Sequence, residues 1–186
     1  MGEPLWVARI LASLADADAR ATAVAHALTV AQLNWRAQPA SWSIGQCLDH
    51  LRVSNQVYCD AMAPALQGTP SGPVDEITPG WFARYFIRTA IDPSTQNRKG
   101  KAPAKITPAT EVDGSVLERF LRSNDEARRF IERAAPYDVN RIRFVNPFVS
   151  IIRFTVGTGI EILARHEHRH LLQAERVRAN PSFPKA

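Results

Sequence analysis

The sequence predicts an all-α fold, a four-helix bundle with one long crossover connection. Three observations carry this prediction. Apolar residues recur at spacings of three and four, helix-end signals separate four long stretches, and no stretch shows the alternation typical of a strand. With 186 residues and 45% hydrophobic content, the chain is expected to form a single domain over residues 1–186.

The first two helices are predicted from their apolar stripes. The first stripe includes Val7 and continues as far as Leu28, so this helix is expected to end before Pro39. Ser43 followed three residues later by Gln46 predicts a capping box at the start of the second helix, which is expected to run to about residue 67.

The third and fourth helices follow a long connection. The third is predicted from near Ser115 to a point before Pro136, which cannot continue a helix. The fourth is expected to begin between Thr155 and Thr158, with Thr158 and Glu161 as its capping box, and to end before a short tail over residues 180–186.

The segment 67–111 carries six prolines and predicts the long crossover, with room for a short helix or turn in the aromatic patch 81–87. The net charge of +5 raises the question of nucleic-acid binding. The basic cluster from Arg98 to Lys105 lacks interleaved aromatic residues for base stacking, and a solvated loop explains it better. A nucleic-acid partner is therefore not favoured, and a contact through this cluster stays open as the weakest alternative.

The compartment is inferred from the cysteines and from apolar stretches. Cys47 and Cys59 fall on one predicted helix, about 18 Å apart along its axis, too far for a disulfide. No apolar run is long enough to cross a bilayer, and the N-terminal residues lack the pattern of a secretory signal. The sequence therefore predicts reduced thiols in a cytoplasmic protein without a membrane partner.

Three histidines are the candidate metal ligands. His166 and His170 stand four residues apart on the apolar stripe of the fourth predicted helix, so their rings share one helix face. His50 lies on the apolar side of the second predicted helix, whereas His168 is turned about 200° from His166 and is expected to face outward. Buried histidines without a partner are costly, and a shared divalent ion with an open position removes that cost.

The run from His166 to His170 also spells HExxH, the zinc-protease motif in which Glu167 would serve as general base. Its context argues against a protease. Only sixteen residues follow His170, and Glu175 belongs to the same predicted helix, where it cannot easily turn back to the same ion.

Two segments, 42–51 and 166–177, resemble the signature segments of the DinB-like superfamily, and the spacing of the helices is similar over almost the whole chain. The resemblance implies a four-helix bundle with a long crossover, often a homodimer. It also implies Zn²⁺ or Ni²⁺ held by one histidine of the second helix and two of the fourth, positions that His50, His166 and His170 match.

Members of that superfamily include hydrolases and transferases or isomerases that use low-molecular-weight thiols, and most have no assigned reaction. We therefore expect a metal-dependent thiol transferase or hydrolase acting on a small molecule. The alternatives are a non-catalytic module that binds a metal and a small ligand, and an ion that only holds the helices together.

Four neighbouring side chains have open roles. Gln46 and Gln173 could orient bound water or a ligand nitrogen, or be solvated. Glu167 could act as a base or a hydrogen-bond acceptor, or pair with an arginine on the helix surface. Cys47 could approach the ion, although a small buried core residue is the commoner role of such a cysteine.

Overall fold

The computed structural model describes residues 2–92 and 102–185 and is predominantly helical, as the sequence predicts. In chain order its elements are α1 (Leu5–Ala25), α2 (Val30–Asn34), α3 (Ile44–Met62), η1 (Ala63–Ala65), α4 (Trp81–Phe86), η2 (Ile87–Ile91), η4 (Ala104–Ile106), α5 (Val116–Ala134), β1 (Arg143–Val145), β2 (Arg153–Thr155) and α6 (Val156–Arg178).

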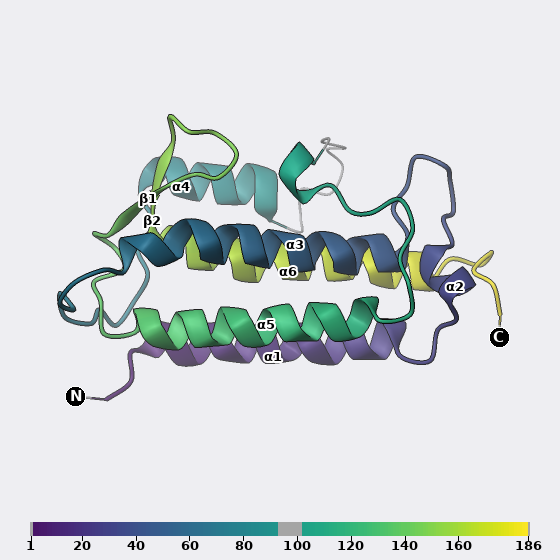
Figure 1. The fold of residues 1–186 in the computed structure, drawn as a ribbon, viewed down its shortest axis with the longest axis horizontal. Helices are drawn as coiled ribbons and strands as arrows, with labels where there is room; N and C mark the ends of the chain where they lie inside the picture. Colours follow the sequence, from purple (N-terminus) through teal and green to yellow (C-terminus); the bar gives the residue numbers. More distant parts are fainter. Residues whose placement is uncertain (1, 93–101, 186) are drawn as a thin grey trace.

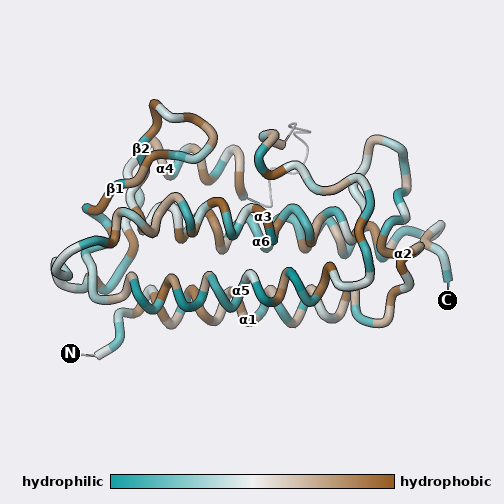
Figure 2. The backbone as a smooth tube through the Cα atoms, viewed as in Figure 1, coloured by the Kyte–Doolittle hydropathy of each residue, from teal (hydrophilic) through white to brown (hydrophobic). Residues whose placement is uncertain are grey.

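The four longest described helices lie side by side (Figure 1), and α3 and α1 each pack against both α5 and α6. The short helix α4 and the β1–β2 hairpin lie beside α3 and α6, on the side away from α1 and α5. Hydrophobic and hydrophilic positions are interleaved along each long helix (Figure 2), as expected for helices that bury one face.

The buried apolar residues form two clusters along the helices. On α6 the first cluster takes residues from Val156 to Ala164, and the second takes residues from Leu171 to Val177. On α1 the first cluster ends at Leu14 and the second begins at Ala17. The break in the apolar core on α6 therefore falls at residues 165–170, the turn that carries the histidines.

A layer of polar residues, all buried except the half-buried Asp18, occupies this break. Asn55 on α3 donates from Nδ2 to Oε1 of Glu167 at 2.9 Å and to Oδ1 of Asn124 at 2.7 Å. Asn124 on α5 donates from Nδ2 to Oδ1 of Asp18 on α1 at 2.7 Å, and Asp18 is paired with Arg128. The polar layer, which we define as Asp18, Asn55, Asn124 and Glu167, therefore joins all four long helices.

The first helix ends earlier than the sequence predicts. It stops at Ala25, and Ala27 adopts a left-handed backbone with φ of 64°. Thr29 then caps the separate helix α2 through a capping box with Gln32. The apolar stripe is continuous across this break because Leu28 still packs against the second cluster, which is why periodicity alone did not reveal it.

The end of α3 and the capping residue of α6 also differ from the prediction. The start of α3 is confirmed, with Ser43 and Gln46 forming the capping box, but α3 ends at Met62, where a 3₁₀ turn containing Pro64 follows. The cap of α6 is Thr155, whose hydroxyl accepts from the backbone N–H of Thr158. The predicted box of Thr158 and Glu161 is wrong.

The expectation of no strand is also wrong, because β1 and β2 form a short antiparallel hairpin in which Phe144 pairs with Phe154. Each strand has three residues, too few for alternation to stand out in the sequence. Both phenylalanines are buried in the first apolar cluster. The hairpin therefore closes one end of the core.

The described part of the crossover contains α4, η2 and η4. Ala83, Ile87 and Ile91 are buried in the first apolar cluster, whereas Trp81 is 76% exposed and Tyr85 55% exposed. In the predicted basic cluster, residues 98–101 lie outside the described residues, and Lys105 donates to the carbonyl of Pro147 at 3.1 Å.

Two other expectations concern the thiols and the bilayer. Cys47 and Cys59 are both free, as predicted, and both lie on α3. Within the described residues, the search for a helix long and apolar enough to span a membrane finds none.

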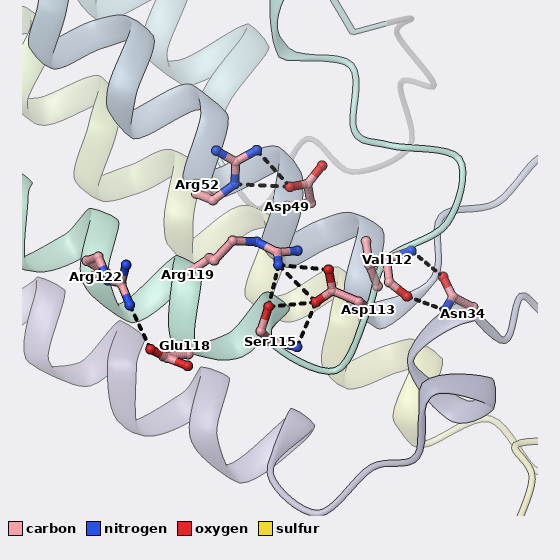
Figure 3. A network of polar contacts seen from close by, with 9 residues as sticks. All are labelled: Asn34, Asp49, Arg52, Val112, Asp113, Ser115, Glu118, Arg119 and Arg122. Atoms are coloured by element: carbon pink, nitrogen blue, oxygen red, sulfur yellow. Dashed lines mark hydrogen bonds and ion pairs between the residues drawn. The ribbon is translucent and has the colours of Figure 1, made fainter.

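Gly45 marks the closest approach between α3 and the end of the crossover. A Cβ at this position would lie 2.3 Å from Cγ2 of Val112 and 3.0 Å from the carbonyl oxygen of Leu33. Val112 cannot easily retreat, because Asn34 accepts from its N–H and donates to its carbonyl, both at 2.8 Å (Figure 3). The glycine therefore allows the crossover to pack closely against α3, the helix that carries His50.

We predict that Gly45→Ala lowers the free energy of unfolding by about 1–3 kcal/mol, because overpacking outweighs the better helix propensity of alanine. Urea denaturation followed by circular dichroism measures the change. Gly114→Ala is the control, since its Cβ would meet only Cγ2 of Val30 at 3.8 Å. Equal stability of Gly45→Ala and the parent chain would contradict the predicted overlap.

A second prediction concerns Glu167, which is fully buried. Burial raises its pKa from 4.5 to about 8, against the opposing effect of the amide donors of Asn55 and Asn124. The folded chain then keeps a proton that the unfolded chain releases above pH 4.5, so this group's contribution to stability falls as pH rises from 4.5 to about 8.

Glu167→Gln should remove that contribution, so its stability relative to the parent chain should rise over this interval. Urea unfolding of both metal-free proteins at a series of pH values tests it. Glu118→Gln, at an exposed position on α5, is the matched control. The same pH slope in Glu167→Gln and the parent would show that Glu167 is ionised in both states.

Candidate metal centre

The first turns of α3 place His50 against the crossover. Gln46, besides capping the helix, donates from Nε2 to the carbonyls of Ala109 and Thr110 at 3.1 and 3.2 Å. Asp49 accepts from the N–H of Ala109 at 2.9 Å and pairs with Arg52, an ion pair drawn in Figure 3. Side chains next to His50 in the sequence thus hold the crossover over it.

His166 and His170 lie one turn apart on α6, and both rings meet the ring of His50. The centroid of the His50 ring lies 4.8 Å from that of His166 and 4.5 Å from that of His170. The three rings thus come together as the sequence predicts, although more than a hundred residues separate His50 from the other two.

The ring nitrogens converge at a spacing that suits one ion. Nε2 of His50 lies 3.1 Å from Nε2 of His166, and the candidate ligand atoms of all three histidines lie within 4.8 Å of one another. Two imidazole nitrogens bound tetrahedrally at about 2.0–2.1 Å from one zinc ion are about 3.3 Å apart. The separation of Nε2 of His50 from Nε2 of His166 is close to this value, so this pair already suits a small divalent cation.

In two of the rings, Nδ1 lies beside a carbonyl oxygen that can accept a hydrogen bond. Nδ1 of His50 lies 2.5 Å from the carbonyl oxygen of Ile106 in η4, and Nδ1 of His170 lies 3.0 Å from Oε1 of Gln173. The main-chain carbonyl of Ile106 can only accept, so it assigns the proton of His50 to Nδ1. Oε1 of Gln173 favours the same tautomer of His170, and in both rings the Nε2 lone pair is then left for a cation. Metal-binding histidines are usually oriented in this way.

Burial keeps the three imidazoles neutral. It lowers the pKa of His50 to about 4 and that of His170 to about 3, and it lowers the pKa of His166 well below its usual value. The charge that His50 and His170 would carry lowers the pKa of His166 further, as does Arg169. Neutral imidazole is the form that binds metal, so no proton competes near neutral pH.

Trp42 lies beside the histidines. Its ring centroid is 4.7 Å from that of His50 and 5.4 Å from that of His170. His50 and His170 are 2% and 9% exposed, whereas His166 is only partly buried. Solvent therefore reaches the group at His166.

The remaining candidates of the sequence analysis lie elsewhere. Glu167 points into the polar layer, so it is neither a surface charge paired with an arginine nor a group open to solvent. Cys47 is buried in the second apolar cluster, where burial raises the pKa of its thiol. Gln46 donates to a main-chain carbonyl of the crossover. Gln173 contacts Nδ1 of His170, which agrees with its expected role of orienting a ligand nitrogen.

His168 is correctly left out of the group but does not simply face outward. Its Nε2 lies 2.8 Å from Oγ of Ser13 and its Nδ1 lies 2.7 Å from Nη1 of Arg20, both on α1. Arg20 also binds Glu175 through two hydrogen bonds of 2.7 and 3.0 Å. His168 thus helps to join α1 to α6.

Sequence reasoning assigned no role to Trp42 or to the carbonyl of Ile106. Trp42 stood directly before the Ser43 cap, where a bulky ring could have been expected to fold back over the helix start. A main-chain carbonyl leaves no signal in a sequence.

Chemically, the site offers three neutral nitrogen donors and one accessible side. In residues 2–92 and 102–185, no fourth His, Cys, Asp or Glu joins the three histidines. Three protein donors with an open position are the pattern of a catalytic or ligand-binding ion, whereas structural zinc sites usually supply four.

The chain is similar to YuaE, an uncharacterized protein of Bacillus subtilis (strain 168), with 26% identity over 149 residues, which is 79% of this chain and 83% of that protein. No solved structure matches the chain significantly. The family model of the DinB superfamily matches residues 13–174, which include all three histidines, the whole of α3 and α5, and the larger part of α1 and α6. The chain belongs to the DinB superfamily.

Proposed function

We propose that this protein binds one divalent metal ion through His50, His166 and His170, and uses it as a metal-dependent thiol transferase or hydrolase on a small molecule. The observation that supports it best is the convergence of three neutral imidazoles, two of them with Nδ1 already hydrogen-bonded. Such a set costs free energy without a cation and gains it with one.

The donor set favours Zn²⁺ or Ni²⁺, because imidazole suits these borderline cations and is a poor ligand for Mg²⁺ or Ca²⁺. A bound ion would lower the pKa of a water molecule or of a low-molecular-weight thiol, making either one a stronger nucleophile at neutral pH. The chain's own residues hold the site: α3 and α6 supply the donors, and Trp42 covers one side of them.

No side chain is assigned as a catalytic base. Glu167 would be the base in the HExxH reading, but its carboxyl group lies in the polar layer with Asn55 and Asn124. These contacts favour a role in holding the α6 turn rather than contact with substrate.

At the level of architecture, we infer that α1, α3, α5 and α6 are the four helices of a DinB-type bundle, with the crossover between α3 and α5. Residues 1–186 as one domain, a homodimer and a cytoplasmic location remain predictions.

The second candidate function is a non-catalytic module that binds a metal and a small ligand. The absence of a titratable side chain in the group, beyond its three histidines, favours it within the described residues. Turnover separates the two functions, since both require the same ion.

We predict one divalent ion per chain, and loss of most of it when His50, His166 or His170 is replaced by alanine, because two imidazoles hold such ions much more weakly than three. Metal content after equilibration with Zn²⁺ or Ni²⁺ and desalting measures this. Ni²⁺ should also quench tryptophan fluorescence through Trp42, and Trp42→Phe should lose that quenching while keeping the ion.

His168→Ala is the matched control, since it removes an imidazole from the same turn of α6 and should retain the ion. Circular dichroism confirms that each variant is folded. Full occupancy in a folded His166→Ala or His170→Ala variant would overturn the proposed ligand set.

We further predict that a small thiol binds the cobalt-loaded protein and produces a sulfur-to-metal charge-transfer band, because the open position can accept a thiolate. Glutathione, cysteine and 2-mercaptoethanol are suitable probes. The apparent affinity should rise with pH from the lowered pKa of the bound thiol up to the pKa of the free thiol, because binding as thiolate releases a proton over that interval.

The enzyme proposal also requires turnover. Thiol-transfer and ester or amide hydrolysis substrates should react faster with the metal-loaded parent than with His50→Ala. If no thiol changes the cobalt spectrum and no substrate reacts faster than with His50→Ala, the binding module replaces the enzyme.

A further inference from the structure

Gln173 occupies a distinctive place at the histidine group. It lies three residues after His170 on α6, so its side chain reaches the ring from the same helix face. Its Oε1 lies 3.0 Å from Nδ1 of His170, so Nε2 is the ring nitrogen of His170 that Gln173 leaves free. Gln173 is only partly buried, so its side chain is not needed to fill the core.

We propose that Gln173 is a positioning residue for the metal site: it holds His170 with the proton on Nδ1, so that Nε2 remains an unprotonated ligand. This inference rests on the proposed metal binding and adds a residue that acts through a ligand rather than on the ion. Its counterpart for His50 is the carbonyl of Ile106.

The contacts at Nδ1 of His50 and at Nδ1 of His170 differ in the kind of group that makes them. The carbonyl of Ile106 can only accept a hydrogen bond, so it fixes the tautomer of His50 without ambiguity. An amide side chain has both an acceptor and a donor, and a rotation that presented its NH₂ group to Nδ1 would favour the proton on Nε2. Nε2 of His170 could then no longer bind a cation.

Substitutions at Gln173 should therefore act in two directions. Glutamate offers only acceptor oxygens when ionised, so Gln173→Glu should fix the productive tautomer and bind metal at least as tightly as the parent chain. Leucine has a similar size and offers no acceptor. Gln173→Leu should bind Zn²⁺ about 10–100-fold more weakly, the usual loss when such a partner is removed.

His166 provides an internal comparison. Its described hydrogen-bonding contact is the one between its Nε2 and that of His50, and its ring is partly exposed. Removing the Gln173 side chain should thus lower the affinity for Zn²⁺ and leave His50 and His166 in place. A purely structural role for Gln173 would instead lower stability and leave the tautomer unchanged.

The experiment combines competition titration with Zn²⁺ and nitrogen NMR of the metal-free full chain. In the parent, the spectrum should show the proton of His170 on Nδ1, and in Gln173→Leu it should show both tautomers. Gln56→Leu, which removes an exposed glutamine paired with Asp60 on α3, is the matched control and should change neither readout.

Equal affinity and an unchanged tautomer in a folded Gln173→Leu would overturn the inference while leaving the three-histidine site intact. A parent spectrum with the proton on Nε2 of His170 would overturn it even if Gln173→Leu failed to fold. Failure of the parent chain to bind Zn²⁺ would instead overturn the proposed function, and a weakened Gln173→Leu rescued by Gln173→Glu would support both.

Discussion

The hydrogen bonds between Glu167, Asn55 and Asn124 are the constraint on which the rest of the structure depends. They interrupt the apolar core at mid-height and connect α3, α5 and α6, with Asp18 bringing in α1. Apolar side chains alone tolerate sliding of one helix along another, because one methyl contact resembles the next. A set of donors and acceptors is satisfied in one alignment, and a shift of one turn would leave a buried carboxyl group unpaired. The polar layer thereby fixes the level at which His50 meets His166 and His170.

Residues 166–170 of α6 therefore make three different sets of contacts. Its inner side sends Glu167 into the polar layer, and the neighbouring face presents His166 and His170 to α3. On the other flank His168 contacts Ser13 and Arg20 of α1. Because these side chains belong to five consecutive residues, the geometry of the histidine pair is coupled to packing on both sides of the helix. The HExxH pattern here belongs to a helix that packs against its neighbours on several faces. Its glutamate contacts other helices and helps to hold them together.

Much of this arrangement could be predicted from the sequence, and the limits have physical causes. Helical periodicity identified the stripes, the Ser43 cap marked the start of α3, and the inward positions of the histidines predicted their meeting. The break at Ala27 was missed because the apolar stripe continues through it and no glycine marks the left-handed backbone. The hairpin was missed because its strands are three residues long. The burial of Glu167 could not be predicted, since its partners Asn55 and Asn124 come from two other helices and look like surface residues in the sequence.

The hydrogen bond between His50 and Ile106 uses a main-chain oxygen, and this has a consequence for how the crossover can change during evolution. Every amino acid carries that carbonyl, so substitutions at position 106 preserve the acceptor as long as an apolar side chain still fills the buried site. An insertion or deletion between η4 and Val112 would move the carbonyl away from the ring, because Asn34 pins the chain at Val112. Relatives with the same site should therefore keep apolar side chains at the buried positions 106 and 112, vary in composition at the exposed positions between them, and hardly vary in the length of that stretch.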